Sequence, residues 1–237
     1  MQSKDEILIQ IRNLDPVTRK ELIADIRREN QIHGIESDWN ASAESILEAI
    51  SSAGPLNQRA VKGMLAEATF KSIQPVRWPN LTDTTPKGDL EYDFKLSDIY
   101  GDIRVQLKNQ RSEKGNPKVL GPRSGAAGAF AVETQKTRNG VDASGNATRF
   151  YRAGSFDILA VCLYASTGHW DRFVFTPEKW LLRKKGQSQY LEILQPILIG
   201  RRDIWTDSLD ECIGWARSDK PGSVIPAGFH VDMQIES

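Results

Sequence analysis

The sequence predicts an α/β (α+β) fold in which helices flank a mixed β-sheet. Three observations indicate it: apolar residues recur at helical spacing up to residue 72, alternate with a period of two between residues 89 and 108, and form an almost continuous run from residue 156 to 165. Of the 237 residues, 39% are hydrophobic, so the chain can bury a substantial core. This length suits one large domain, or a core with an appendage.

Helices are expected ahead of the sheet. An Asp-Pro pair opens the first at residue 16, and this helix runs to about residue 34. The second covers residues 42–54 and ends at a Gly-Pro pair, and the third covers residues 57–72. We therefore divide the chain into an N-terminal helical region, residues 1–55, and a main region, residues 56–237, which holds the sheet and a C-terminal elaboration.

The period of two predicts a hairpin. The segment "DLEYDFKL", residues 89–96, alternates apolar with charged side chains, and "IRVQLK", residues 103–108, resumes the alternation after turn residues. Matching the apolar faces sets four pairs of residues opposite one another: Phe94 and Val105, Tyr92 and Leu107, Asp93 and Gln106, Glu91 and Lys108. Opposed side chains have Cβ atoms about 5 Å apart, so two oxygens of such a pair can share one cation.

The second half of the chain predicts further strands. The continuous apolar run at residues 156–165 is typical of a strand buried on both faces, and residues 171–177 form a plausible antiparallel neighbour. From residue 182 onward the sequence indicates a helix, an extended segment and a final helix at residues 208–216.

Charge is uneven along the chain, although the total is zero. Residues 81–103 hold six acids against two bases, and residues 104–152 hold ten bases against three acids. An acidic segment followed by a basic, glycine-rich one is what a metal site beside a phosphate-binding surface needs. An ordinary solvated loop gives the same pattern, so charge alone leaves both interpretations open.

Several classes of protein are excluded by what the sequence lacks. Two distant cysteines make neither a disulfide framework nor a zinc site, and they fit a reducing compartment. The sequence has no apolar run of transmembrane length, and its first residues are too charged for a signal peptide, so we expect a cytoplasmic protein. The three histidines are scattered, and neither a phosphate loop nor a serine-hydrolase elbow is found.

Asp93, twelve intervening residues, and then Gln106-Leu107-Lys108 resemble the active-site hairpin of the PD-(D/E)XK nuclease superfamily, which includes most type II restriction endonucleases. An upstream helix with Glu67 and the strand "FDILAVCLY" support the resemblance. It implies a restriction-endonuclease-like α-β-β-β-α-β core over residues 57–176. Two positions depart from the pattern: Tyr92 stands where proline is usual, and Gln106 replaces an acid, a variant also seen in Mrr-like enzymes.

The resemblance implies an Mg²⁺-dependent endonuclease acting on double-stranded DNA. Asp93, the Gln106 amide oxygen and the Leu107 carbonyl would hold the metal, because Mg²⁺ prefers oxygen ligands. Lys108 would orient or deprotonate the attacking water and neutralise the phosphorane. Because an amide in place of a carboxylate removes one charge, another acid is expected to help: we prefer Glu67, and the alternatives are Asp89 and Glu91.

The basic segment is expected to contact DNA through phosphates and base edges. Its candidate residues are Arg111, Lys114, Lys118, Arg123, Gln135, Lys136, Arg138, Asn139, Arg149 and Arg152. The pair Glu133 and Gln135 also resembles a variant catalytic pair, but no well-spaced strand with an aspartate accompanies it.

The short chain, without a motor or methyltransferase motif, favours a type II enzyme of a restriction system, and cleavage of both strands favours a homodimer. The alternative is a non-catalytic DNA-binding or assembly protein that retains the nuclease fold, which the glutamine would explain. A helical interaction protein with an incidental sheet leaves the change from acidic to basic residues unexplained.

Overall fold

The chain divides into two compact units, residues 1–61 and 62–237, which are described separately. The structure is a computed structural model, and it describes residues 3–29, 33–121, 126–136, 149–198 and 204–219. The helix α5 (Pro55–Arg77) passes from the first unit into the second.

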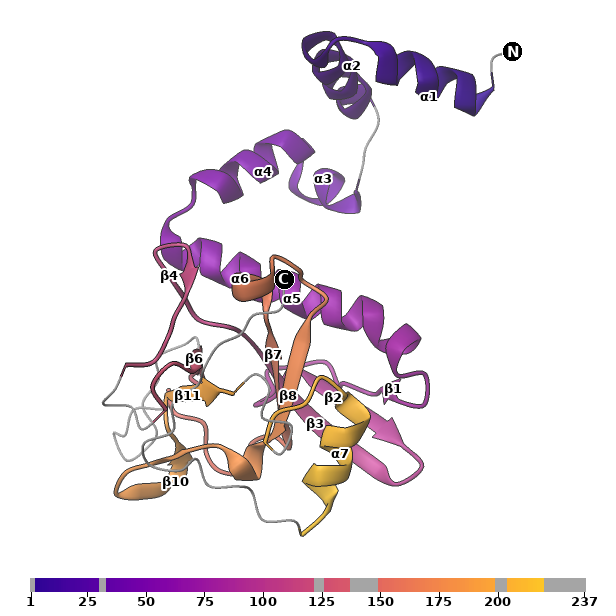
Figure 1. The fold of residues 1–237 in the computed structure, drawn as a ribbon. Helices are drawn as coiled ribbons and strands as arrows, with labels where there is room; N and C mark the ends of the chain where they lie inside the picture. The colour runs from indigo at the N-terminus through magenta and orange to yellow at the C-terminus, as the bar shows by residue number, and fades with distance from the viewer. Residues whose placement is uncertain (1–2, 30–32, 122–125, 137–148, 199–203, 220–237) are drawn as a thin grey trace. The chain divides into compact units, whose positions relative to one another are not determined.

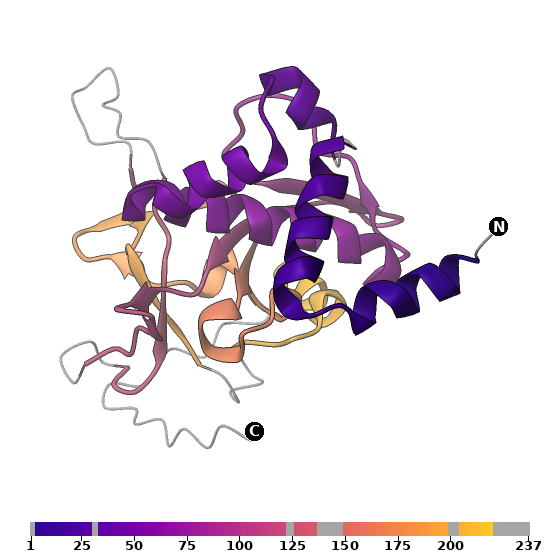
Figure 2. The same cartoon turned by 90° about the horizontal axis from the view of Figure 1, so that it is seen from above.

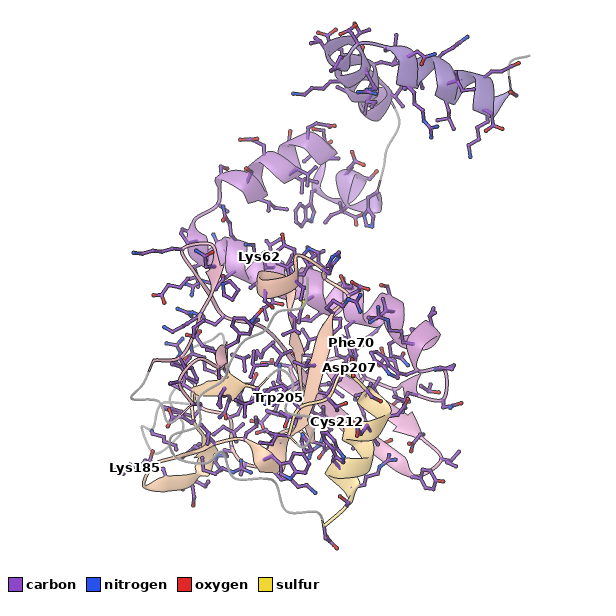
Figure 3. The ribbon with its side chains drawn as sticks, in the orientation of Figure 1. Lys62, Phe70, Lys185, Trp205, Asp207 and Cys212 are labelled. Atoms are coloured by element: carbon purple, nitrogen blue, oxygen red, sulfur yellow. The ribbon has the colours of Figure 1, made fainter. Side chains whose placement is uncertain are left out.

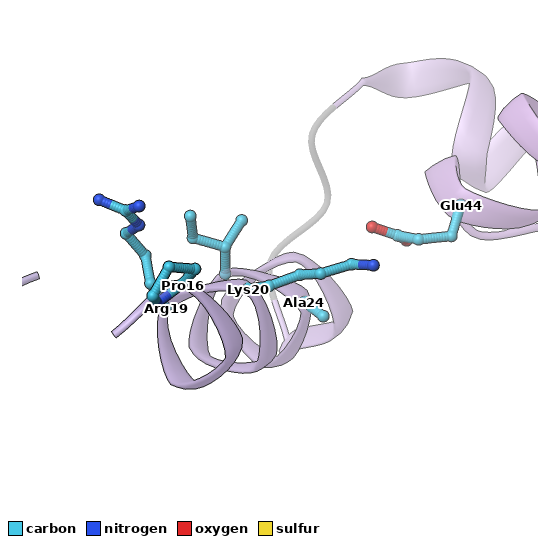
Figure 4. Close-up of a pocket in the computed structure, with 6 residues that line it drawn as sticks. Pro16, Arg19, Lys20, Ala24 and Glu44 are labelled. Atoms are coloured by element: carbon cyan, nitrogen blue, oxygen red, sulfur yellow. The ribbon is translucent and has the colours of Figure 1, made fainter. Parts of the chain in front are cut away.

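The first unit consists of short helices with defined caps. Their bounds are α1 Lys4–Asn13, α2 Pro16–Glu29, α3 Gly34–Trp39 and α4 Ala43–Ser52. Asp15 caps α2 by accepting the N–H groups of Val17 and Thr18. Figure 4 shows a hollow that Lys20 and Ala24 of α2 line together with Glu44. The predicted helix over residues 16–34 is shorter than expected, because α2 ends at Glu29 and α3 is a separate helix.

The second unit is built on a five-stranded mixed sheet in the order β1-β2-β3-β7-β8 (Figure 1). The bounds are β1 Thr82–Asp83, β2 Phe94–Asp98, β3 Gly101–Asn109, β7 Ile158–Cys162 and β8 Phe173–Pro177. β3 and β7 are parallel, and all other neighbours are antiparallel. The short helix α6, Tyr164–Thr167, connects β7 to β8.

Helices α5 and α7 (Leu209–Arg217) cover one face of this sheet, and Figures 1 and 2 show α5 lying along it. Ala66 and Phe70 of α5 are one turn apart and fully buried, so α5 forms because a narrow apolar stripe meets the sheet. Gln74 anchors the end of α5, since its amide donates to the carbonyls of Trp78 (3.2 Å) and Leu81 (2.8 Å).

The other face carries small strand pairs instead of helices. They are β6 Phe130–Glu133 with β11 Leu194–Ile197, and β9 Arg183–Lys184 with β10 Gln187–Leu191. A further pair, β4 Ser112–Glu113 with β5 Asn116–Pro117, follows β3 in the chain. A 3-10 turn, Glu178–Trp180, follows β8. Buried apolar side chains of these segments pack on Leu159, Val161 and Val174 of the sheet. The expected mixed sheet flanked by helices is therefore confirmed, with α5 and α7 on the same face.

The predicted hairpin is correct in its centre and wrong at its start. Phe94 pairs with Val105 as expected, but β2 begins only at Phe94, and residues 89–93 are bends. Tyr92 packs against the apolar cluster on the face opposite that of Phe94, so it does not lie across from Leu107. The reason is local: the carboxylate of Asp93 takes the Leu107 N–H that a longer strand would have bound.

Three further expectations differ from the structure. The third predicted helix continues past residue 72 to Arg77 and contains Pro75. The helix expected after residue 181 is replaced by β9, β10 and β11 in the described part of that region. The strand at residues 171–177 and the final helix are confirmed by β8 and α7.

Candidate active site

Asp93 lies where the chain turns into β2. Its backbone N–H donates to the Val105 carbonyl (3.0 Å), its carboxylate accepts the Leu107 N–H (2.7 Å), and it also accepts the side-chain amide of Gln106. The N–H and C=O of one strand residue point to the same edge, so the Leu107 carbonyl lies on the edge that Asp93 occupies. The Gln106 amide nitrogen is 3.3 Å from that carbonyl oxygen. A carboxylate, an amide and a peptide carbonyl therefore meet at one point.

Gln106 and Lys108 lie on the same face of β3, opposite Leu107, because side chains alternate along a strand. Gln106 is only 1% exposed. Burial lowers the pKa of Lys108, and the negative charges of Asp93 and Glu67 oppose that shift. Lys108 is thus a desolvated ammonium that gives up its proton more readily than an exposed lysine does.

Glu67 reaches this place from α5. Burial raises the pKa of Glu67, Asp93 raises it further, and Lys108 lowers it. Burial also raises the pKa of Asp93, against the opposing effects of Lys108 and of the hydrogen bonds from Leu107 and Gln106. A hydrogen bond therefore joins Asp93 and Gln106, and the charges of Glu67 and Lys108 act on Asp93 from α5 and β3. Two acids that resist ionisation beside an amide and a carbonyl are a set of oxygen donors for a hard cation.

The described residues contain no group of three or more His, Cys, Asp or Glu side chains suited to hold a metal ion. A cation at this site would depend on the amide and the carbonyl as well as on the two acids. Asp89, one of the alternative acids, is exposed.

Glu91 does not lie across from Lys108, so that expected pair is wrong. Its carboxylate accepts hydrogen bonds from Lys136 (2.7 Å) and Ser155 (3.0 Å), and these lower its pKa. The bends at residues 89–93 explain the difference, because Glu91 is no longer part of the strand alternation.

Tyr151 is a residue of this site that the sequence did not reveal. It is 5% exposed, and its ring centroid is 5.4 Å from the Lys108 ammonium and 5.8 Å from that of Lys136. Burial and the nearby acids raise the pKa of its hydroxyl, so the phenol stays neutral. The one signal in the sequence was a pair of aromatic residues between two arginines, "RFYR", and nothing in that pattern connected it to β3.

The predicted DNA-contacting residues fall into separate groups. Some form ion pairs: Arg111 with Glu133 (2.5 Å), Lys118 with Glu113 (3.4 Å) and Lys136 with Glu91 (2.7 Å). Arg152 is exposed and lies over the ring of Tyr190. Lys114 occupies the turn between β4 and β5, and Arg149 precedes Tyr151 in the chain. Arg123, Arg138 and Asn139 lie outside the described residues.

The competing pair Glu133 and Gln135 lies at the end of β6 and just after it. Glu133 is ion-paired with Arg111, and Gln135 donates to the same carboxylate at 3.3 Å.

Comparisons with known proteins add little to these residues. No protein-family model matches the chain, and no curated protein matches it. A search of solved structures finds a bacterial homing endonuclease, I-Ssp6803I, at 20% identity and a TM-score of 0.36, over 60% of this chain and 80% of that chain. This similarity is too weak to identify a family. None of the described helices has the length and apolar character needed to cross a membrane.

Proposed function

We propose that this chain is a metal-dependent endonuclease that hydrolyses phosphodiester bonds of double-stranded DNA, and that it acts as a type II site-specific enzyme of a restriction system. One observation carries the proposal. The Asp93 carboxylate, the Gln106 amide and the Leu107 backbone meet on one edge of β3, beside the desolvated Lys108. A homodimer would allow both strands to be cut.

The donor set suits Mg²⁺. Asp93, Glu67 and the Leu107 carbonyl would offer oxygens directly. The Gln106 side chain now donates an N–H to Asp93, so its amide would have to rotate before its oxygen could bind a metal. Bound there, Mg²⁺ would act as a Lewis acid on the phosphoryl group and offset the charge of the two acids. The raised pKa values of Asp93 and Glu67 support this assignment, because desolvation outweighs the charge of Lys108 at both carboxylates and a bound cation would offset it.

Lys108 has the chemistry of the proton carrier. Its lowered pKa increases the share of neutral amine near neutral pH, so Nζ can accept a proton from the attacking water. In its charged form the same group stabilises the negative charge that develops on the phosphorane. The ring of Tyr151 limits where the lysine can lie.

A non-catalytic DNA-binding protein is the second candidate. The observation that favours it is that the Asp93 carboxylate already accepts two N–H donors, from Gln106 and Leu107. The desolvated Lys108 speaks against it, because burying an ammonium is unfavourable and a protein that only binds DNA gains nothing from it.

Incubation of the purified protein with supercoiled plasmid DNA of mixed sequence, in Mg²⁺ and in EDTA, tests the proposal. We expect cleavage in Mg²⁺ alone, and a loss of at least about 100-fold for Lys108→Ala. Lys95→Ala is the matched control, because Lys95 lies on the same hairpin and pairs with Asp102 on β3. Binding of plasmid without cleavage under every metal condition would contradict the endonuclease and favour the second candidate.

A further inference from the structure

The candidate site continues directly into the hairpin formed by β9 and β10. The carbonyl of Tyr151 accepts the N–H of Leu191 (2.9 Å), and the N–H of Ala153 donates to the carbonyl of Gln189 (2.9 Å). Arg152, between them, pairs with Tyr190. Residues 151–153, which include the Tyr151 ring beside Lys108, are therefore hydrogen-bonded through their backbone to β10.

The outer part of this hairpin is polar and basic. Gly186, at a φ of 75°, forms the turn, and residues 187–189, which are Gln, Ser and Gln, are all exposed. Figure 3 shows Lys185 at the outer end of the hairpin. The ammonium of Lys184 lies 3.8 Å from the centroid of the Phe150 ring, which holds the charge in place without using an acid.

Most of these charges are not neutralised by the protein. Arg183 is paired with the buried Glu178 and belongs to the base of the hairpin. Lys184 and Lys185, by contrast, make no salt bridge with any acid in the described part of the chain, and Arg152 acts on Glu91 only through its charge, which lowers the pKa of Glu91. Their charge remains available to a phosphate, and an ammonium over a ring face keeps its N–H donors.

We propose that the β9–β10 hairpin, together with Arg152, is the surface that holds double-stranded DNA beside the cleavage site. Lys184, Lys185 and Arg152 would contact phosphates, and Gln187 and Gln189 would read base edges. This inference rests on the proposed function and adds the element that positions the substrate.

The backbone hydrogen bonds between residues 151–153 and β10 support a contact close to the cut. Gln187 is three residues from Tyr190, which corresponds to roughly 10 Å along a strand. Successive base pairs are about 3.4 Å apart along the helix axis, so the hairpin would reach about three base pairs from Tyr190. We therefore expect it to contact positions that flank the broken bond.

The chemistry favours duplex DNA over a protein partner. A two-stranded ribbon fits the major groove, and glutamine can form paired hydrogen bonds with adenine there. Protein interfaces are centred on exposed apolar side chains, whereas the exposed residues of this hairpin, 185–189, are a lysine, a glycine, a serine and two glutamines.

Equilibrium binding of a fluorescein-labelled DNA duplex of mixed sequence, measured in EDTA over a salt series, tests the proposal without cleavage. The test variant is Lys184→Ala with Lys185→Ala. The control is Lys62→Ala with Lys87→Ala, which removes the same charge from two exposed positions of the same unit. We expect the test variant to bind about tenfold more weakly, with a salt slope smaller by about two, and the control to bind as the wild type.

A second variant separates base reading from charge. Gln187→Ala with Gln189→Ala should leave the salt slope unchanged and reduce discrimination among cleaved plasmid sequences by about tenfold.

Wild-type affinity and salt slope for the lysine variant would overturn the hairpin proposal while leaving the proposed endonuclease activity intact. The opposite result, hairpin-dependent binding by a protein that never cleaves, would refute the endonuclease and leave the hairpin as a DNA-binding element. If the lysine variant bound duplex RNA more weakly but bound duplex DNA as the wild type does, the hairpin proposal would also be overturned.

Discussion

The two ends of the β2–β3 hairpin carry similar residues in opposite environments. At the turn, Lys95 pairs with Asp102 (2.6 Å), and Arg217 of α7 pairs with Asp98 (2.7 Å). These partners lower the pKa of both acids, and Asp102 raises the pKa of Lys95. The turn is thus a set of ordinary ion pairs in contact with water.

At the other end the signs are reversed. Burial raises the pKa of Asp93 and Glu67 and lowers the pKa of Lys108, although opposite charges are close by. Desolvation outweighs pairing there, whereas pairing dominates at the turn. At the turn of the hairpin, the ion pairs between acids and bases are therefore stabilising. At the other end, burial makes the charged forms of Asp93 and Lys108 unfavourable. Groups with such shifted pKa values are typical of reactive sites.

The largest difference between the two ends should be seen in metal binding and cleavage. We expect Asp93→Ala to abolish cleavage and Mg²⁺ binding and to leave DNA binding unchanged or tighter, because a charge that repels phosphate is removed. Asp102→Ala, at the turn, should cleave as the wild type. Calorimetric titration with Mg²⁺ is the measurement, and equal Mg²⁺ affinity of the Asp93 variant and the wild type would refute the assignment.

Stability should change in the opposite direction from activity. Asp93→Asn combined with Lys108→Met removes two buried charges, so we expect about 1 kcal/mol of added stability and a Tm higher by about 2–4 °C, with no cleavage. Lys95→Met combined with Asp102→Asn should leave the Tm and the cleavage rate close to those of the wild type. Thermal unfolding followed by circular dichroism measures both, and a lower Tm for the buried pair would count against desolvation.

The same pair predicts a dependence on pH. The pKa of Asp93 is raised in the folded state, so Asp93 contributes stability below its unfolded pKa, and this contribution is lost as pH rises. The pKa of Lys108 is lowered in the folded state, so the contribution of Lys108 to stability is lost as pH falls. In its charged form each group opposes folding, because burial disfavours the charge. The gain in Tm should therefore be largest near neutral pH and shrink in acid, where Asp93 of the wild type takes up a proton.

Tyr151 should give a smaller effect. Tyr151→Leu removes the ring beside Lys108, and we expect the cleavage rate at saturating DNA to fall about tenfold with little change in KM. Tyr151→Phe keeps the ring and should restore a rate within about threefold of the wild type. Steady-state cleavage distinguishes a positioning ring from a reactive hydroxyl, since equal losses in both variants would assign the role to the hydroxyl.

Some of this could be predicted from the sequence because it depends on local pattern. Alternation fixed the pairing of Phe94 with Val105, and with it the approach of Asp93 to Gln106. The same alternation failed for Tyr92 and Glu91, since the polar pattern continues where the strand hydrogen bonds do not.

The remaining features depend on contacts between distant parts of the chain. Tyr151 meets Lys108 and Leu191 through tertiary packing that no spacing in the sequence encodes. The predicted helix after residue 181 is wrong for a similar reason. In this region β10 completes its backbone hydrogen bonds with β9 on one side and with residues 151–153 on the other.

Cleavage rates of the wild type, Gln106→Glu and Gln106→Leu across an Mg²⁺ series test the central claim most directly. If the buried end of the hairpin binds the metal through Gln106, the glutamate variant should stay active and saturate at lower Mg²⁺, because it adds a carboxylate ligand. The leucine variant should lose most activity while retaining a cooperative thermal transition, since leucine offers a cation no ligand. A leucine variant that cleaves at the wild-type rate at every Mg²⁺ concentration would contradict the account and remove Gln106 from the site.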